Sequence, residues 1–212
     1  MTAGRGASPP ASRVHGRRRW RAVALLLPVA AWMWLAFMLV HELGHVAGAW
    51  ATGGRLVCVN VFPGQLSSTL VRPNPRPGVV LWSGLLCGWI APAAARLATR
   101  TTGRPRRVLD CWAAFCLLAG GGYLAGGGSE RLTDTGQLVA AGWPLPLLVA
   151  IGATVASLGY SWSRRAWPRL LTDLGRQPPT RRDVAAAWLL LAAWVAGQWA
   201  LAAWLAEQGP AA

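Results

Sequence analysis

Residues 22–51 read AVALLLPVAAWMWLAFMLVHELGHVAGAWA, and this stretch decides the fold. Its first part, from Ala22 to Val40, contains no charged side chain. An apolar run of about 20 residues matches the thickness of the hydrocarbon core of a bilayer. The stretch therefore predicts a transmembrane helix whose last turns carry the polar residues His41, Glu42 and His45.

The rest of the chain is similarly apolar. Of its 212 residues, 54% are hydrophobic and only 13% are charged, a composition too apolar for an ordinary soluble domain. Apolar runs of comparable length recur along the chain. We predict an all-α membrane protein with a single domain over 22–207 and about five transmembrane helices, at about 22–51, 79–97, 108–126, 138–162 and 184–206. Pro144 and Pro146 are expected to bend the fourth helix.

Both ends of the chain differ from this core. Residues 1–21 are rich in Arg, Pro, Ser and Gly and predict a disordered basic tail, and residues 208–212 form a short C-terminal tail. A basic segment followed by an apolar run also resembles a secretory signal peptide, with Ala47-Gly48-Ala49 as its cleavage site. Because the apolar run is longer than that of a signal peptide, we expect a retained membrane helix.

The segment between the first two helices predicts a β-hairpin at the membrane surface. Residues 55–62 are rich in β-branched side chains, Pro63-Gly64 is a turn signal, and residues 65–71 suit a return strand. A proline-rich connection then leads to the second helix.

The basic residues indicate an orientation. All 21 are arginine, and 17 of them lie in the N-terminal tail and in the loops at 96–107 and 164–182. With five transmembrane helices, these three segments lie on the same side of the membrane. By the positive-inside rule the N-terminus is cytoplasmic. The net charge of +14 could attract nucleic acid, but arginines placed between apolar runs indicate topology signals, so we expect the lipid bilayer and no nucleic acid as partner. The arginine-only, alanine- and glycine-rich composition indicates a GC-rich genome, and we expect a bacterial plasma membrane.

The four cysteines predict neither disulfides nor a cysteine metal site. Cys58, Cys87, Cys111 and Cys116 form no CxxC pair, and three of them fall in predicted spans. We interpret them as small hydrophobic residues.

The HExxH pattern of residues 41–45 predicts a metal site. Four-residue spacing puts His41 and His45 about 40° apart around a helix and about 6 Å apart along it, so both imidazoles can bind one ion from the same face. Glu42 stands beside them as a general base. Since Glu42 is the only acidic residue before Asp110 and charge inside a membrane helix is costly, the pattern favours function. The alternative is a buried His–Glu pair that packs neighbouring helices.

A catalytic zinc ion usually has three protein ligands and one open position for water. The predicted topology brings Glu130 and Asp134 to the same side as the two histidines, and puts Asp110, Asp173 and Asp183 on the other side. We predict Asp134 as the third ligand and Glu130 as the runner-up. The competing role for Asp134 is that of a helix N-cap.

The sequence around the HExxH pattern resembles that of a known family. The stretch HELGHVAGA at residues 41–49, with GGRLV at residues 53–57, is similar to the M50 family of intramembrane zinc metalloproteases, the site-2 protease type. The resemblance implies HExxH in a membrane helix, a small β-structure after it, and an aspartate ligand two spans later. Asp134-Thr135-Gly136 would be the counterpart of the family's Asp-Gly motif, and Ser83-Gly84-Leu85 with Pro92 resembles its small-residue segment.

The predicted function is that of a zinc-dependent intramembrane endopeptidase. Zn²⁺ would be bound by His41, His45 and Asp134, Glu42 would be the catalytic base, and the substrates would be membrane-spanning proteins. Two alternatives belong to other classes. One is a zinc-binding membrane scaffold or regulator without proteolysis, and the other is a transporter in which HExxH is incidental.

Overall fold

The computed structural model describes residues 11–207; for residues 11–18 it describes the backbone only, and residues 1–10 and 208–212 lie outside the described part. Within the described range the chain forms six α-helices, one short 3₁₀ helix and a two-stranded antiparallel sheet. Five of these helices are long and apolar enough to cross a membrane. The predicted fold class, an all-α membrane protein with a hairpin after its first helix, is confirmed. The elements are α1 (Ala11–Thr52), β1 (Leu56–Asn60), β2 (Ser68–Val71), α2 (Pro77–Ala98), α3 (Gly103–Gly126), η1 (Gly127–Ser129), α4 (Asp134–Ala140), α5 (Leu145–Arg176) and α6 (Arg181–Glu207).

Two predicted boundaries are wrong. The first helix begins at Ala11 instead of Ala22, so residues 11–21 are helical and are not an irregular tail. Arginine favours helix almost as well as leucine, which is why a basic segment can extend an apolar helix. The predicted N-terminal tail over residues 1–10 and the C-terminal tail lie outside the described residues.

The predicted fourth span, 138–162, is also wrong. The chain forms the short helix α4, turns at Gly142 with a φ of 92°, and starts α5 with Pro144 as N-cap. Proline has no N–H to donate and suits the first turn of a helix, so Pro146 begins a helix here instead of bending one. This break makes α4 a separate element that can lie across the end of the bundle.

The end of α1 sends the chain back along the bundle as a hairpin. Gly53 adopts a φ of 74°, the Gly53 N–H donates to Trp50 O, and the Gly54 N–H donates to Ala49 O at 2.8 Å. These two bonds form a Schellman motif, in which glycine takes the left-handed conformation at low cost. Strand β1 then pairs with β2 in antiparallel register, with Val59 opposite Thr69. The predicted hairpin is confirmed.

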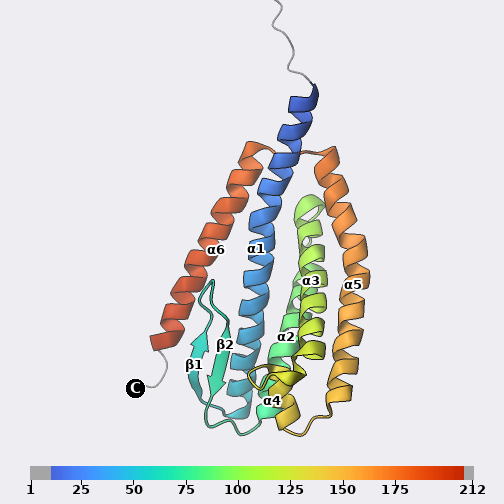
Figure 1. Ribbon diagram of the computed structural model, residues 1–212. Helices are drawn as coiled ribbons and strands as arrows, with labels where there is room; N and C mark the ends of the chain where they lie inside the picture. The colour runs from blue at the N-terminus through green and yellow to red at the C-terminus, as the bar shows by residue number, and fades with distance from the viewer. Residues whose placement is uncertain (1–10, 208–212) are drawn as a thin grey trace, which may run out of the picture.

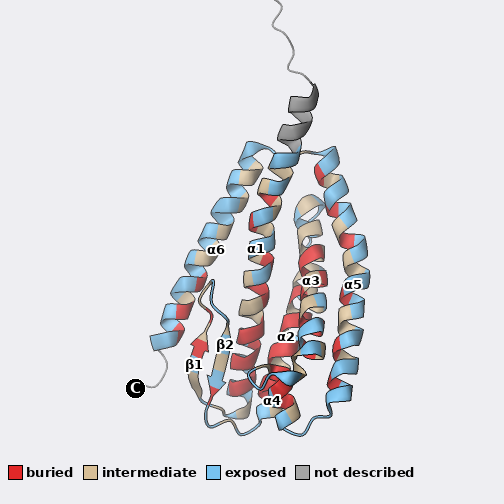
Figure 2. Ribbon diagram, in the orientation of Figure 1, coloured by how far each residue is buried: buried red, intermediate tan, exposed pale blue. Residues whose placement is uncertain are grey.

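The helices form a bundle in which α1 packs along α2, α3 packs along α5, and α6 lies against α1 and β1 (Figure 1). Buried residues concentrate where α1, α2 and α3 face one another, while α5 and α6 expose much of their surface (Figure 2). At one end, Arg104 of α3 reaches Asp173 of α5 and Asp183 of α6. At the other end lie the hairpin and α4.

Candidate metal centre

Helix α1 presents its two histidines to one point. The Nε2 atoms of His41 and His45 lie 3.1 Å apart, as the four-residue spacing predicts, and both residues are buried. The Nδ1 atom of His45 lies 2.8 Å from Val80 O of α2. Because a carbonyl oxygen only accepts hydrogen bonds, this contact places a proton on Nδ1. A neutral His45 therefore turns the lone pair of Nε2 toward the site.

The close approach of α2 depends on a missing side chain. A Cβ built on Gly84 would lie closer to Cε1 and Nε2 of the His45 ring than non-bonded atoms can approach. On α1, a Cβ on Gly44 would lie 2.7 Å from the Cβ of Cys87 and 2.8 Å from the Cα of Gly84. These two glycines let the helices pack closely enough for Val80 to reach His45. Gly84, within the segment Ser83-Gly84-Leu85 noted in the sequence, therefore helps to position His45 in the candidate site.

The third potential ligand comes from α4. Asp134 Oδ2 lies 2.9 Å from His41 Nε2 and 3.4 Å from His45 Nε2. Among the residues that the structure describes, these three side chains form the one group of His, Cys, Asp or Glu that could hold a metal ion, with potential ligand atoms all within 4.8 Å of one another. Glu130, the runner-up, is exposed and outside this group.

Asp134 is not the helix N-cap. Thr133 has that role, because its hydroxyl accepts a hydrogen bond from the Gly136 N–H at 3.0 Å. The helix is tied to α3 by the Thr135 hydroxyl, which donates to Leu124 O at 3.1 Å. Tyr123 of α3 accepts a hydrogen bond from the Asp134 N–H at 3.1 Å. These contacts hold the backbone of Asp134 and leave its carboxylate to face the histidines.

The donor set fits a metal cation. Asp134 Oδ2 is buried and receives no hydrogen bond of acceptable geometry from any residue in the described range, although two ring nitrogens lie beside it. Burial raises the pKa of the Asp134 carboxyl, but the imidazoles of His41 and His45 outweigh this effect and hold the pKa below its ordinary range. A carboxylate oxygen and two imidazole nitrogens thus converge. Tetrahedral bonds of about 2.0–2.1 Å to a zinc ion would space their ligand atoms about 3.3 Å apart, close to the distances seen here.

Glu42 lies beside this group and is held by the hairpin. It is only 3% exposed. Its Oε1 accepts a hydrogen bond from the Ser67 hydroxyl at 2.8 Å, and its Oε2 accepts one from Thr69 at 2.7 Å. The carboxylate is thus buried with hydrogen-bonding partners, as a polar group in such a position requires.

A cavity of about 140 Å³ contains all four predicted site residues. It is lined by His41, Glu42, His45 and Asp134, and by the inner side of β2. An apolar cavity of about 280 Å³ shares four lining residues with it, which are His41, Glu42, Ser67 and Tyr123. The site therefore has both room for water and an apolar neighbouring space.

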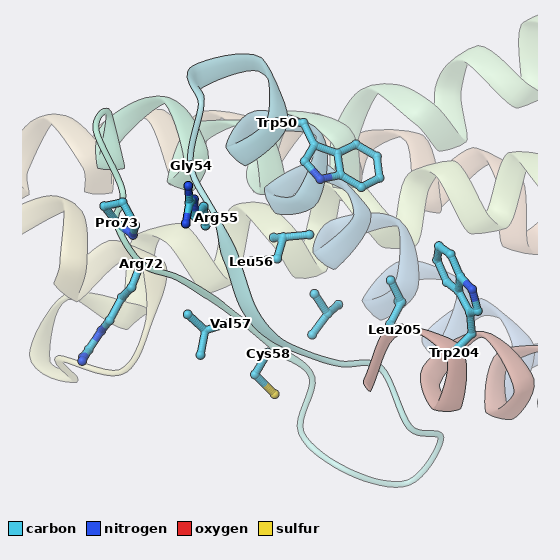
Figure 3. Close-up of a pocket in the computed structure, with 11 residues that line it drawn as sticks. Trp50, Gly54, Arg55, Leu56, Val57, Cys58, Arg72, Pro73, Trp204 and Leu205 are labelled. Atoms are coloured by element: carbon cyan, nitrogen blue, oxygen red, sulfur yellow. The ribbon is translucent and has the colours of Figure 1, made fainter. Parts of the chain in front are cut away.

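A larger cavity, of about 670 Å³, lies elsewhere. It is bordered by β1, Trp50 at the end of α1 and Trp204 near the end of α6 (Figure 3). None of the three potential metal ligands lines it. Cavity volume therefore does not identify the candidate metal site, because the residues that could bind a metal ion line a smaller cavity.

Sequence reasoning missed the residues that support the site, which are Ser67, Thr69, Val80 and Tyr123. No sequence pattern marks Ser67 and Thr69 as inward-facing, because Ser67, Ser68 and Thr69 form an unbroken polar run. No sequence signal marks Val80, which contributes a backbone carbonyl. The cysteines form no part of the site: all four are free, and Cys111 and Cys116 are buried as expected for small hydrophobic residues.

Comparisons with protein-family models, with curated proteins and with solved structures gave no match for this chain.

Proposed function

We propose that this protein is a zinc-dependent intramembrane endopeptidase. The observation that carries the proposal is the convergence of His41, His45 and Asp134, from two elements far apart in the chain, beside Glu42 in a helix apolar enough to cross a membrane. The resemblance of residues 41–57 to M50 metalloproteases supports the same function, as does the Asp134-Thr135-Gly136 segment.

Zinc bound by His41, His45 and Asp134 would lower the pKa of a water molecule and polarise the scissile carbonyl. Glu42 takes the proton from the attacking water and delivers it to the leaving amine. The carboxylate can do so because it has about four lone-pair positions, and the hydrogen bonds from Ser67 and Thr69 use two of them.

The substrates in this proposal are membrane-spanning proteins. A transmembrane helix satisfies its own backbone hydrogen bonds, so the segment to be cut must unwind. Strand β2 lines the cavity of the site, and an unwound segment can pair with a strand edge. The arginine distribution supports a cytoplasmic N-terminus, which puts the site near the opposite face of a bacterial plasma membrane.

The experiment that tests the proposal compares the wild-type protein with Glu42→Gln in liposomes containing a set of single-span membrane proteins of varied sequence. We expect cleavage by the wild type and a loss of about 10²–10⁴-fold in Glu42→Gln, because general-base catalysis contributes about that factor. Zinc content should be unchanged in the variant. The matched control is Glu130→Gln, an exposed carboxylate outside the site, which should cleave normally.

Two outcomes would contradict the proposal. Full activity in Glu42→Gln would remove its role as the base. Stoichiometric zinc without cleavage of any substrate would favour the alternative, a zinc-binding membrane scaffold or regulator.

A further inference from the structure

We propose that Ser67 and Thr69 are positioning residues that hold the Glu42 carboxylate and fix the hairpin at the HExxH turn of α1. The catalytic consequence of these two contacts rests on the proposed protease function. The contacts themselves are independent of that function.

The first argument is the geometry of the contacts. Each oxygen of the Glu42 carboxylate accepts one hydrogen bond, from Ser67 at 2.8 Å and from Thr69 at 2.7 Å. A glutamate side chain has several rotatable bonds, and two hydroxyls in fixed positions remove most of that freedom. The base is therefore oriented by the hairpin and not by α1 alone.

The second argument is the alternation along the strand. Ser67 and Thr69 are half-buried, whereas Ser68 and Leu70 are exposed. Side chains of a strand point alternately to opposite faces, so residues two apart share a face. Ser67, directly before β2, and Thr69, within it, follow this alternation and bring two hydroxyls to one carboxylate. A shift of one residue would replace them with Ser68 and Leu70.

The third argument is where the strand lies. Residues 67–71 line the same cavity as the potential metal ligands. If a substrate segment pairs with β2, the hydrogen bonds to Glu42 set the distance between that segment and the base. Other contacts keep the hairpin folded without them: Val59 and Val61 pack against Val46, and the Gln198 amide donates to Val61 O at 2.8 Å.

The experiment uses the double variant Ser67→Ala/Thr69→Val in the full-length protein. The matched control is Ser68→Ala, which removes the neighbouring hydroxyl on the exposed face. A second control, Thr69→Ser, keeps the hydroxyl. Melting temperature and zinc content establish that each variant is folded and can be loaded.

The first measurement is hydrogen exchange of the segment 61–72 without zinc. We expect exchange at least about tenfold faster in the double variant, since it loses the two hydrogen bonds that tie the hairpin to Glu42. Exchange in Ser68→Ala should match the wild type. Unchanged exchange in the double variant would overturn the proposal whatever the activity.

The second measurement is cleavage of a peptide that corresponds to one membrane-spanning helix and that the wild type cuts. We expect kcat to fall by about 10–100-fold in the double variant, because a small misplacement of a catalytic group has an effect of this size. KM should change little, and Thr69→Ser, which keeps the hydroxyl, should retain most of the wild-type kcat. Equal kcat in the double variant and in Ser68→Ala would overturn the positioning role and leave the protease function standing.

A third outcome separates the two proposals. If the wild type cleaves nothing, the protease function fails together with the catalytic role of Ser67 and Thr69. The exchange measurement then still decides whether the two hydroxyls hold the hairpin.

Discussion

The two ends of the bundle surround their carboxylates with different partners. At the arginine-rich end, Asp110 accepts a hydrogen bond from Arg96 at 2.6 Å, and Asp173 lies 3.5 Å from Arg107. At the hairpin end, Glu42 faces hydroxyls and Asp134 faces imidazoles. Glu42 and Asp134 are buried whereas Asp110 and Asp173 are half-buried, and only the arginine-rich end places guanidinium groups beside its carboxylates. An aspartate paired with a guanidinium is already neutralised, so it has little to gain from a metal ion. Asp134 has no such partner within the described residues.

The difference shows that the same helical bundle can give aspartate residues two different environments. The Arg96–Asp110 pair joins α2 to α3, and a charge pair that is partly buried is costly to break. Asp134 instead faces the imidazoles of His41 and His45, and the three side chains together could hold a metal ion. The same residue type is structural at one end and a candidate ligand at the other because of its neighbours alone.

The largest expected effect comes from Asp134→Ala. Loss of supporting contacts around a metal ligand typically lowers affinity by 10–100-fold, so loss of a direct ligand should lower zinc affinity by at least about 100-fold. Competition with a chelator of known affinity measures this. Glu130→Ala is the control and should bind zinc like the wild type; a loss of zinc in that variant instead would restore Glu130 as the ligand.

A second prediction concerns the close packing of α1 and α2. Gly84→Ala should lower the free energy of unfolding by about 1–3 kcal/mol, because overpacking forces neighbours to move, and should also lower zinc content, because His45 must shift. Gly122→Ala on α3 meets nothing within 4 Å and should be neutral or stabilising. Thermal denaturation and metal analysis of both variants check this. Equal behaviour of the two variants would show that the helices do not pack as closely as Gly84 implies.

A third prediction sharpens the contrast between the ends. Asp110→Asn should lower the free energy of unfolding by about 1–2 kcal/mol, since the Arg96 guanidinium then keeps its burial without its charge partner. Zinc affinity should not change, because the pair lies at the other end of the bundle. Denaturation together with zinc titration tests both statements. Loss of zinc in this variant would mean that the two ends are coupled.

The smallest expected effect belongs to Tyr123→Phe. The Asp134 N–H would lose its acceptor, at a cost of about 1 kcal/mol in stability, and zinc affinity should fall by at most about tenfold. Tyr160→Phe on the exposed surface of α5 is the control. An effect as large as that of Asp134→Ala would show that Tyr123 acts on the metal directly.

Much of this arrangement could be predicted from the sequence because it depends on local patterns. Apolar runs indicated the spans now seen as α2, α3 and α6, and Pro63-Gly64 indicated the hairpin. Pro144 and Pro146 were harder to interpret, since proline can either bend a helix or begin one. Gly142 and Pro144 together made a turn, and the predicted fourth span became α4 and α5.

The amino-acid sequence by itself determined that His41 and His45 share a helix face, because four residues make slightly more than one turn. It also determined that α1 is apolar enough for a membrane. Only the tertiary structure decided that Asp134, and not Glu130, meets the two histidines, and that Ser67 and Thr69 hold Glu42. These contacts depend on how close α2 and the hairpin approach α1 and where α4 lies, and such distances follow from packing between elements, which no local pattern encodes.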